Sequence, residues 1–209
     1  MTTFLVGVPF GVLARQSGLE LGPTIGMSVI MFAGAAQFAA IELLRGGAPS
    51  ALVVLTVLLI NLRHVLMGIA LRPFLHDVPR RERAALAYLL VDESFAMAIG
   101  WFRRGGRGVA YYVTFGAGLW LCWNVATVIG ALAGPAIGDP RRLGIDFAIT
   151  AVFISIVVVG VRGRADVAVA LAAALLSGAL ATLGAGAVAV VAAGLVAPLA
   201  SFAAARSDR

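Results

Sequence analysis

The sequence predicts an all-α, polytopic membrane protein, from its composition and from the length of its apolar segments. Of the 209 residues, 61% are hydrophobic and only 12% are charged, and the mean hydropathy is +1.01. A soluble domain carries about 25% charged residues, so this chain lacks the polar side chains that cover a globular surface. Its apolar segments are continuous, unlike the alternating strands of a membrane barrel, and several approach or exceed the ~20 residues that span a bilayer. We therefore expect one integral domain over residues 1–209, crossing the cytoplasmic membrane several times.

Charge and cysteine content exclude several other classes of protein. The net charge of +6 comes from sixteen arginines that stand mainly in short loops, which is a topology signal rather than a nucleic-acid-binding surface. One cysteine, Cys122, permits no intramolecular disulfide and no zinc-ligand spacing. No metalloprotease or phosphate-loop motif is present. We expect no enzyme activity, no metal, no cofactor and no nucleic-acid partner.

The first two predicted helices cover residues 2–16 and residues 23–44. The first is short for a span, and Pro9 between two glycines favours a break, so a full helix, a re-entrant half-helix and a truncated span all stay open. The second carries FAGAAQFAA at its centre. There Gly34 and the alanines after it would let another backbone approach closely, and Gln37 adds an amide.

The third and fourth helices, residues 51–71 and 84–102, hold the polar side chains of greatest interest. An arginine-rich aqueous loop connects them. Polar groups stand near the centre of the third helix and at comparable depth in the fourth: Asn61, Arg63, His64, Asp92 and Glu93. A charge at that depth costs at least ~2.5–3.5 kcal/mol on insertion scales, so it must be paired or face a polar cavity.

The remainder of the chain supplies the other spans. Residues 109–132 and 143–161 form the fifth and sixth predicted helices, and residues 166–205 are too long for one span and are interpreted as two. The total is seven or eight. Pro9 early in the chain and Pro198 late in it hint at the broken helices of inverted-repeat transporters. Similar arginine counts on both sides leave the orientation open.

Arg63, Asp92 and Glu93 are the candidate working centre. Helices joined by a short loop are antiparallel by default, and Arg63 lies about eight residues before the end of its helix, as Asp92 lies about eight after the start of its own. Both would therefore sit ~12 Å below the same membrane face, where an ion pair forms easily. The two carboxylates point about 100° apart, so one pairs with Arg63 and the other faces a second helix or a cavity.

This cluster has a functional and a structural interpretation. A buried salt bridge that only joins two helices is the structural one, but such pairs often fail to offset their desolvation, which favours a further use. Burial favours the protonated carboxyl group and the arginine favours the ionised one, which makes a carboxylate here a candidate for proton coupling.

The remaining polar residues have simpler explanations beside the functional ones. His64 points to a different face from Arg63, and a hydrogen bond to a backbone carbonyl is favoured over a role as proton relay or ligand. For Asn61 and Gln37, interhelical hydrogen bonding and substrate contact are equally weighted.

Three stretches resemble the AzlC family of branched-chain amino acid permeases and exporters: FAGAAQFAA at residues 32–40, NLRHVLMGIAL at 61–71 and DESFAMA at 92–98. Their order, their spacing and the arginine-rich loop between the last two also fit. The resemblance is strong over residues 7–99 and looser beyond them. It implies a secondary transporter that exports branched-chain or other hydrophobic amino acids, with a small AzlD-like membrane subunit as partner.

A zwitterionic amino acid suits the centre identified from the residues. Its carboxylate would bind Arg63, its ammonium would bind Asp92 or Glu93, and its aliphatic side chain would pack on the small residues 34–36. Coupling to the proton gradient is expected through the carboxylates. Two alternatives stay open: a structural or assembly subunit in which the charges only lock helices, and a transporter of another small solute.

Overall fold

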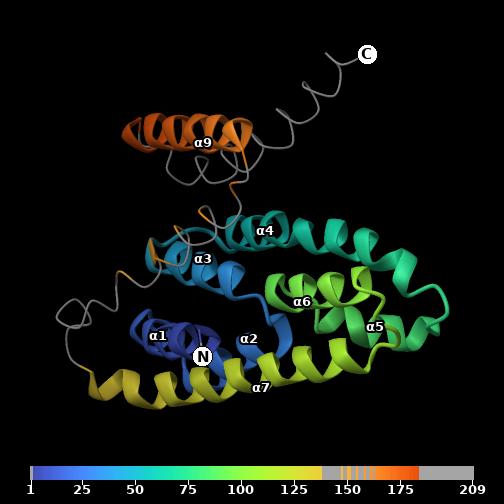
Figure 1. The fold of residues 1–209 in the computed structure, drawn as a ribbon. Coiled ribbons are helices and arrows are strands. Elements are labelled where there is room, and N and C mark those ends of the chain that lie inside the picture. Colours follow the sequence, from blue (N-terminus) through green and yellow to red (C-terminus); the bar gives the residue numbers. More distant parts are fainter. Residues whose placement is uncertain are drawn as a thin grey trace.

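The computed structural model describes residues 2–137 and 163–183, with a few isolated positions between 147 and 161. All regular structure in these ranges is helical (Figure 1), which confirms the all-α fold class. The elements are α1 (Thr2–Gln16), α2 (Leu21–Met31), α3 (Gly34–Arg45), α4 (Ser50–Leu71), η1 (Arg72–Phe74), α5 (Arg80–Tyr88), α6 (Asp92–Arg103), α7 (Ala110–Ala133), η2 (Gly134–Ala136) and α9 (Arg164–Thr182).

Two helices are long and apolar enough to cross a membrane, at Ser50–Phe74 and Ala110–Ala136. The described residues therefore hold fewer full-length spans than the seven or eight expected for the whole chain, although the helical membrane fold is confirmed. Most of the predicted sixth helix, and the predicted last helix with Pro198, lie outside the described residues.

Two helices that the sequence predicts to be continuous are each broken in the middle. The break that the sequence favours is at a different place, Pro9. The helix expected over residues 23–44 is divided into α2 and α3 by a first break at residues 32–33, where Phe32 adopts a left-handed conformation with φ 38°. The helix expected over residues 84–102 is divided into α5 and α6 by a second break at residues 89–91. By contrast, α1 continues through Pro9, so the break favoured there is not observed.

The backbones of α1 and α7 approach each other closely at glycines. A Cβ atom added to Gly7 would lie 2.7 Å from the Cβ of Ala126, and one added to Gly11 or Gly130 would collide with backbone atoms of the opposite helix. Glycines in register on both helices thus allow direct contact of the two backbones, as in small-residue packing of membrane helices. From the sequence, a close approach of two backbones was predicted at Gly34 instead.

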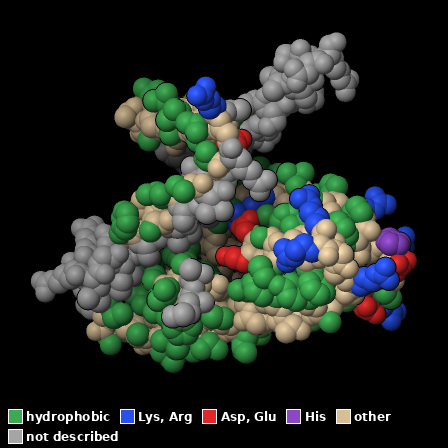
Figure 2. Space-filling model, viewed as in Figure 1, with side chains coloured by type: hydrophobic (Ala, Val, Ile, Leu, Met, Phe, Trp, Pro, Cys, Tyr) green, Lys and Arg blue, Asp and Glu red, His purple; other side chains and the backbone are tan. Residues whose placement is uncertain are grey.

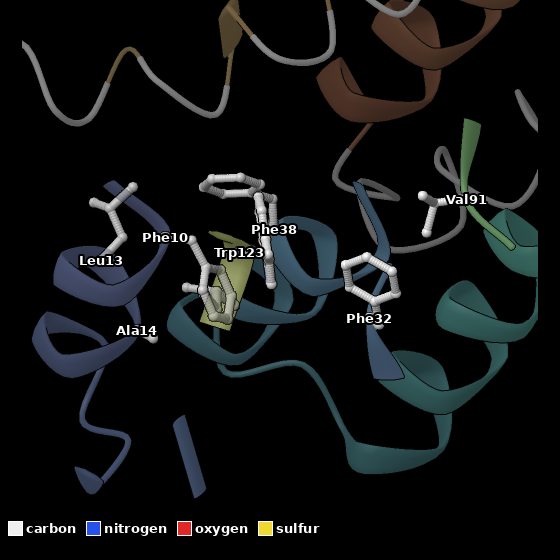
Figure 3. Packing of buried hydrophobic residues seen from close by; sticks show 8 residues of the cluster. Phe10, Leu13, Ala14, Phe32, Phe38, Val91 and Trp123 are labelled. Carbon is white, nitrogen blue, oxygen red and sulfur yellow. The ribbon is translucent and has the colours of Figure 1, made fainter. Parts of the chain in front are cut away.

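Both breaks contribute to one apolar cluster. Phe10 of α1 packs edge-to-face on Phe38 of α3, with ring centroids 5.6 Å apart, and lies 5.7 Å from the Trp123 ring of α7 (Figure 3). Phe32 of the first break and Val91 of the second belong to the same cluster and are less than 10% exposed. The two interruptions are therefore parts of one packed core.

Candidate functional site

An ion pair joins α4 to the second break. Arg63 Nη1 lies 2.8 Å from Asp92 Oδ2, and the two side chains are 26% and 45% exposed. Among the ion pairs of the described residues, this is the one that connects two helices. The expected pairing is thus present, but Asp92 is the first residue of α6 and does not stand eight residues inside a longer helix.

The start of α6 is determined by Ser94. Its Oγ accepts a hydrogen bond from the Val91 N–H at 2.9 Å and donates to the Leu89 carbonyl at 2.7 Å, so it satisfies backbone groups that the break leaves open. This arrangement places Asp92 and Glu93 in the first helical turn. Anionic side chains are stabilised there by the positive end of the helix dipole.

Glu93 differs from its neighbour in having no partner. It is exposed, and it forms no ion pair or hydrogen bond with the described part of the chain. Figure 2 shows acidic and basic atoms together at a hollow in the middle of the molecule, apart from the charged side chains gathered at its right-hand end. One paired and one open carboxylate agree with the expectation that the two point in different directions.

The polar side chains in the middle of α4 lie on different sides of the helix, and two of their atoms have no hydrogen-bond partner among the described residues. His64 Nδ1 lies 3.0 Å from the Asn61 carbonyl oxygen, which is the simple role favoured for this histidine. Asn61 Oδ1 and Arg63 Nε are buried atoms without a hydrogen-bond partner. Leaving such an atom unpaired costs about 1–3 kcal/mol. Because Asn61 and Arg63 are two positions apart, about 200° around α4, only the Arg63 Nε belongs to the side of the ion pair.

Gln37 lies in a separate, fully buried polar network at the first break. Ser28 Oγ is its hub: it accepts from Gln37 Nε2 at 3.0 Å and from Trp123 Nε1 at 3.1 Å, and it shares a hydrogen bond of 2.8 Å with Thr127 Oγ1. Interhelical hydrogen bonding is thus what the structure shows for Gln37. No hydrogen bond or ion pair links it to Arg63, although its Oε1 remains without a partner.

Gly34 lies under an aromatic ring. A Cβ atom at this position would stand 3.0 Å from Cη2 of Trp123. Gly34 is therefore covered by the indole, and Ala35 and Ala36 are buried as well, at 7% and 0% exposed, so these small residues offer no open apolar surface. The approach at Gly34 is by a side chain and not by a backbone.

Sequence reasoning did not identify the polar residues that hold the breaks. Tyr88 Oη donates to the Val29 carbonyl of α2 and accepts a hydrogen bond of 2.6 Å from Trp120 Nε1, so it ties the end of α5 to the end of α2. Ser28 was also overlooked, and Ser94 was considered only as the serine of a catalytic dyad with His64, which lacked the sequence context of a nucleophile, and not as the residue that holds the break. Isolated hydroxyl groups within strongly apolar helices are the signal that points to them, since a buried hydroxyl needs a partner.

No group of three or more metal-ligating side chains occurs among the described residues. The groups that the site does present are suited to recognition by charge: a guanidinium, a paired carboxylate and an exposed carboxylate, with Val91 of the apolar cluster beside them.

Comparison with known proteins places this chain in a family. Residues 1–137 match the family model described as AzlC protein. The inner membrane protein YgaZ of Escherichia coli K12 is 31% identical over 182 residues, which is 84% of this chain and 73% of that protein. A membrane protein of Archaeoglobus fulgidus is 29% identical over 161 residues, 76% of this chain and 69% of that protein. The branched-chain amino acid transport protein AzlC of Bacillus subtilis 168 is 26% identical over 161 residues, 72% of this chain and 59% of that protein.

No solved structure matches the chain. The family model covers more than half of the sequence, and its matched residues include both breaks and the Arg63–Asp92 pair. The chain therefore belongs to the AzlC family, and it is a helical membrane protein.

Proposed function

We propose that this protein is the large subunit of a secondary transporter that exports branched-chain or other hydrophobic amino acids across the cytoplasmic membrane. The observation that carries the proposal is the Arg63–Asp92 ion pair, held at a break between two half-helices of a membrane protein. Discontinuous helices with charged groups at the break are a recurrent way to build a transport site. The Bacillus subtilis relative, named as a branched-chain amino acid transport protein, supports the substrate class.

The ion pair matches the charges of a zwitterionic amino acid. The substrate carboxylate would bind Arg63, whose Nε has no other partner, through two N–H groups. The substrate ammonium would bind Asp92, and Glu93 beside it adds negative charge. The bound substrate would separate Arg63 from Asp92 and pair with each of them in turn. The site can therefore open without leaving an unpaired charge in an apolar environment.

The aliphatic side chain of the substrate requires an apolar surface next to these charges. Val91 directly precedes Asp92 and belongs to the cluster that contains Phe32 and Phe38. This cluster is therefore the surface that we assign to the side chain, in place of the buried residues 34–36.

Proton coupling follows from competition at Asp92. A proton on this carboxylate removes the charge that holds Arg63, and the substrate ammonium needs the same carboxylate in its ionised form. Proton and amino acid then exclude one another at one group, which is the condition for exchange of inward protons against outward substrate. An efflux pH profile that stays unchanged in an Asp92→Asn, Glu93→Gln double variant would contradict this coupling.

The central test is efflux of preloaded leucine, isoleucine, valine and methionine from cells that express the chain. We expect faster efflux when the small AzlD-like membrane subunit is expressed as well, and loss of that efflux in Arg63→Gln at unchanged membrane abundance. Arg45→Gln is the matched control, because Arg45 contacts only Glu42 of its own helix, at 3.8 Å. Normal efflux by Arg63→Gln would count against the proposal.

A structural or assembly subunit is the second candidate, since the same ion pair connects α4 to α6. In that case Arg63→Gln would reduce the amount of protein in the membrane and leave flux per molecule unchanged. A transporter of another small solute would keep normal abundance but show no efflux of branched-chain amino acids.

A further inference from the structure

A groove separate from the ion pair lies between the carboxyl-terminal half of α4, α5 and α7. It encloses about 320 Å³. Its inner side is formed by Leu86, Leu90 and Tyr112, which are at most 7% exposed, and its outer rim by Val65 and Ile69, which are 58% and 62% exposed. Because α4 is long and apolar enough to span the membrane, this exposed rim opens the groove toward the lipid chains.

Two guanidinium groups stand at one end of the groove. Arg72 directly follows α4, and Arg83 lies in the first turn of α5. Neither side chain forms an ion pair or a hydrogen bond with the described residues. Figure 2 shows charged side chains gathered at the end of the molecule where Figure 1 places the connection from α4 to α5. This end is therefore the membrane–water interface.

The groove thus changes from apolar to cationic along α4. Seven residues separate Val65 from Arg72, a rise of roughly 10 Å along the helix. None of the lining residues is acidic. An amphiphile with an apolar chain and an anionic head fits this pattern, and a free amino acid does not, because the groove offers no carboxylate for its ammonium group.

We propose that this groove is a binding site for an anionic phospholipid. One acyl chain lies between α4 and α5 against Leu86 and Leu90, and the headgroup phosphate binds Arg72 and Arg83. Arginine pairs with phosphate oxygens through parallel N–H groups, and basic pockets between membrane helices are known to select anionic headgroups.

Native mass spectrometry of the purified full-length protein tests the headgroup half of the proposal. The probes are dioleoyl phosphatidylglycerol and dioleoyl phosphatidylcholine, which share their chains and differ in net charge. We expect preferential binding of phosphatidylglycerol, weakened about five-fold by Arg72→Gln or Arg83→Gln. Arg81→Gln is the control, because Arg81 belongs to the same half-helix but does not line the groove.

Equal weakening by Arg81→Gln would overturn the proposal, because it would assign binding to general surface charge. Displacement of the phosphatidylglycerol by inorganic phosphate at equal concentration would also overturn it, since the site would then recognise phosphate and not a lipid.

The acyl-chain half is tested by filling the groove. Gly68 lines the groove, and a Cβ atom there would meet nothing within 4 Å, so Gly68→Phe is the variant chosen to place a ring in the groove. Gly118 of α7 is equally open and does not line the groove, so Gly118→Phe is the matched control. We expect Gly68→Phe to reduce phosphatidylglycerol binding at least five-fold and Gly118→Phe to leave it unchanged. Unchanged binding by Gly68→Phe, in protein of normal thermal stability, would overturn the proposal.

Discussion

The two helix breaks have opposite chemistry. The first, at residues 32–33, is neutral and buried: Phe32 is 5% exposed, and Ser28 and Gln37 are 0% exposed. The second, at residues 89–91, leads into a half-helix that opens with Asp92, whose side chain is 45% exposed, and with the unpaired Glu93. Both breaks share one apolar cluster, but only the second presents charge.

The difference separates a fixed framework from an open site. A serine hydroxyl offers one donor and accepts two hydrogen bonds, and Ser28 uses all three with Gln37, Trp123 and Thr127. The second break instead leads to the exposed carboxylate of Glu93, which forms no ion pair or hydrogen bond with the described residues. We infer that changes at the first break reduce stability, whereas changes at the second reduce transport.

The largest expected effect is on flux, from Asp92→Asn. The variant keeps the shape of the side chain but loses the charge that binds Arg63 and the substrate ammonium. A hydrogen bond to a charged group contributes ~1.5–3 kcal/mol, so efflux per molecule should fall roughly 10- to 100-fold. Efflux and membrane abundance are measured together, with Asp77→Asn as control because Asp77 is 89% exposed and pairs only with its neighbour His76. Full activity of Asp92→Asn would remove the distinction between the two breaks.

The largest expected effect on stability comes from Ser28→Ala. Three interhelical hydrogen bonds end on this hydroxyl, and each contributes about 0.6 kcal/mol in a membrane protein, so thermal denaturation in detergent should report a loss of about 2 kcal/mol. Thr24→Val is the control: Thr24 is equally buried on the same helix, but its hydroxyl donates only to the Glu20 carbonyl of its own turn. A similar loss in both variants would show that the network does not stabilise the break.

The positions of Arg63 and Asp92 relative to their helix ends predicted the ion pair, but they did not predict the break beside it. The pair forms although Asp92 begins α6 and does not stand inside a continuous helix. The breaks were not predicted because the residues in them have ordinary apolar side chains. At the second break, the contact that satisfies the freed backbone is made by a residue of the next helix: the Ser94 hydroxyl donates to the Leu89 carbonyl.

The hydrogen bond between Ser28 and Gln37 illustrates the same limit. These residues are nine positions apart, so in a continuous helix they would lie on opposite faces and roughly 13 Å apart along the axis. Their 3.0 Å hydrogen bond exists only because the chain turns at Phe32. A pattern that depends on tertiary folding cannot be recognised from helical periodicity.

A smaller effect is expected from the link between the two breaks, in Tyr88→Phe. This change removes the hydrogen bonds of Tyr88 with the Val29 carbonyl and with Trp120, so stability should fall by about 1 kcal/mol, half the loss in Ser28→Ala. Tyr111→Phe is the control, because Tyr111 stacks on Trp101 through its ring and its hydroxyl forms no hydrogen bond with the described residues. If Tyr88→Phe behaves like the control, the two breaks are held independently.

The smallest effect is expected from Glu93→Gln, and it sharpens the comparison within the second break itself. Glu93 is exposed and has no partner among the described residues, so its charge acts on a substrate only through solvent. Such a screened interaction contributes at most about 1 kcal/mol and more often half of that, so efflux should fall about two-fold with unchanged stability. Measuring Glu93→Gln beside Asp92→Asn in one efflux assay compares two adjacent carboxylates that differ in pairing. If both variants lose efflux to the same extent, the substrate ammonium depends on the two carboxylates jointly, and the special role of the paired one is wrong.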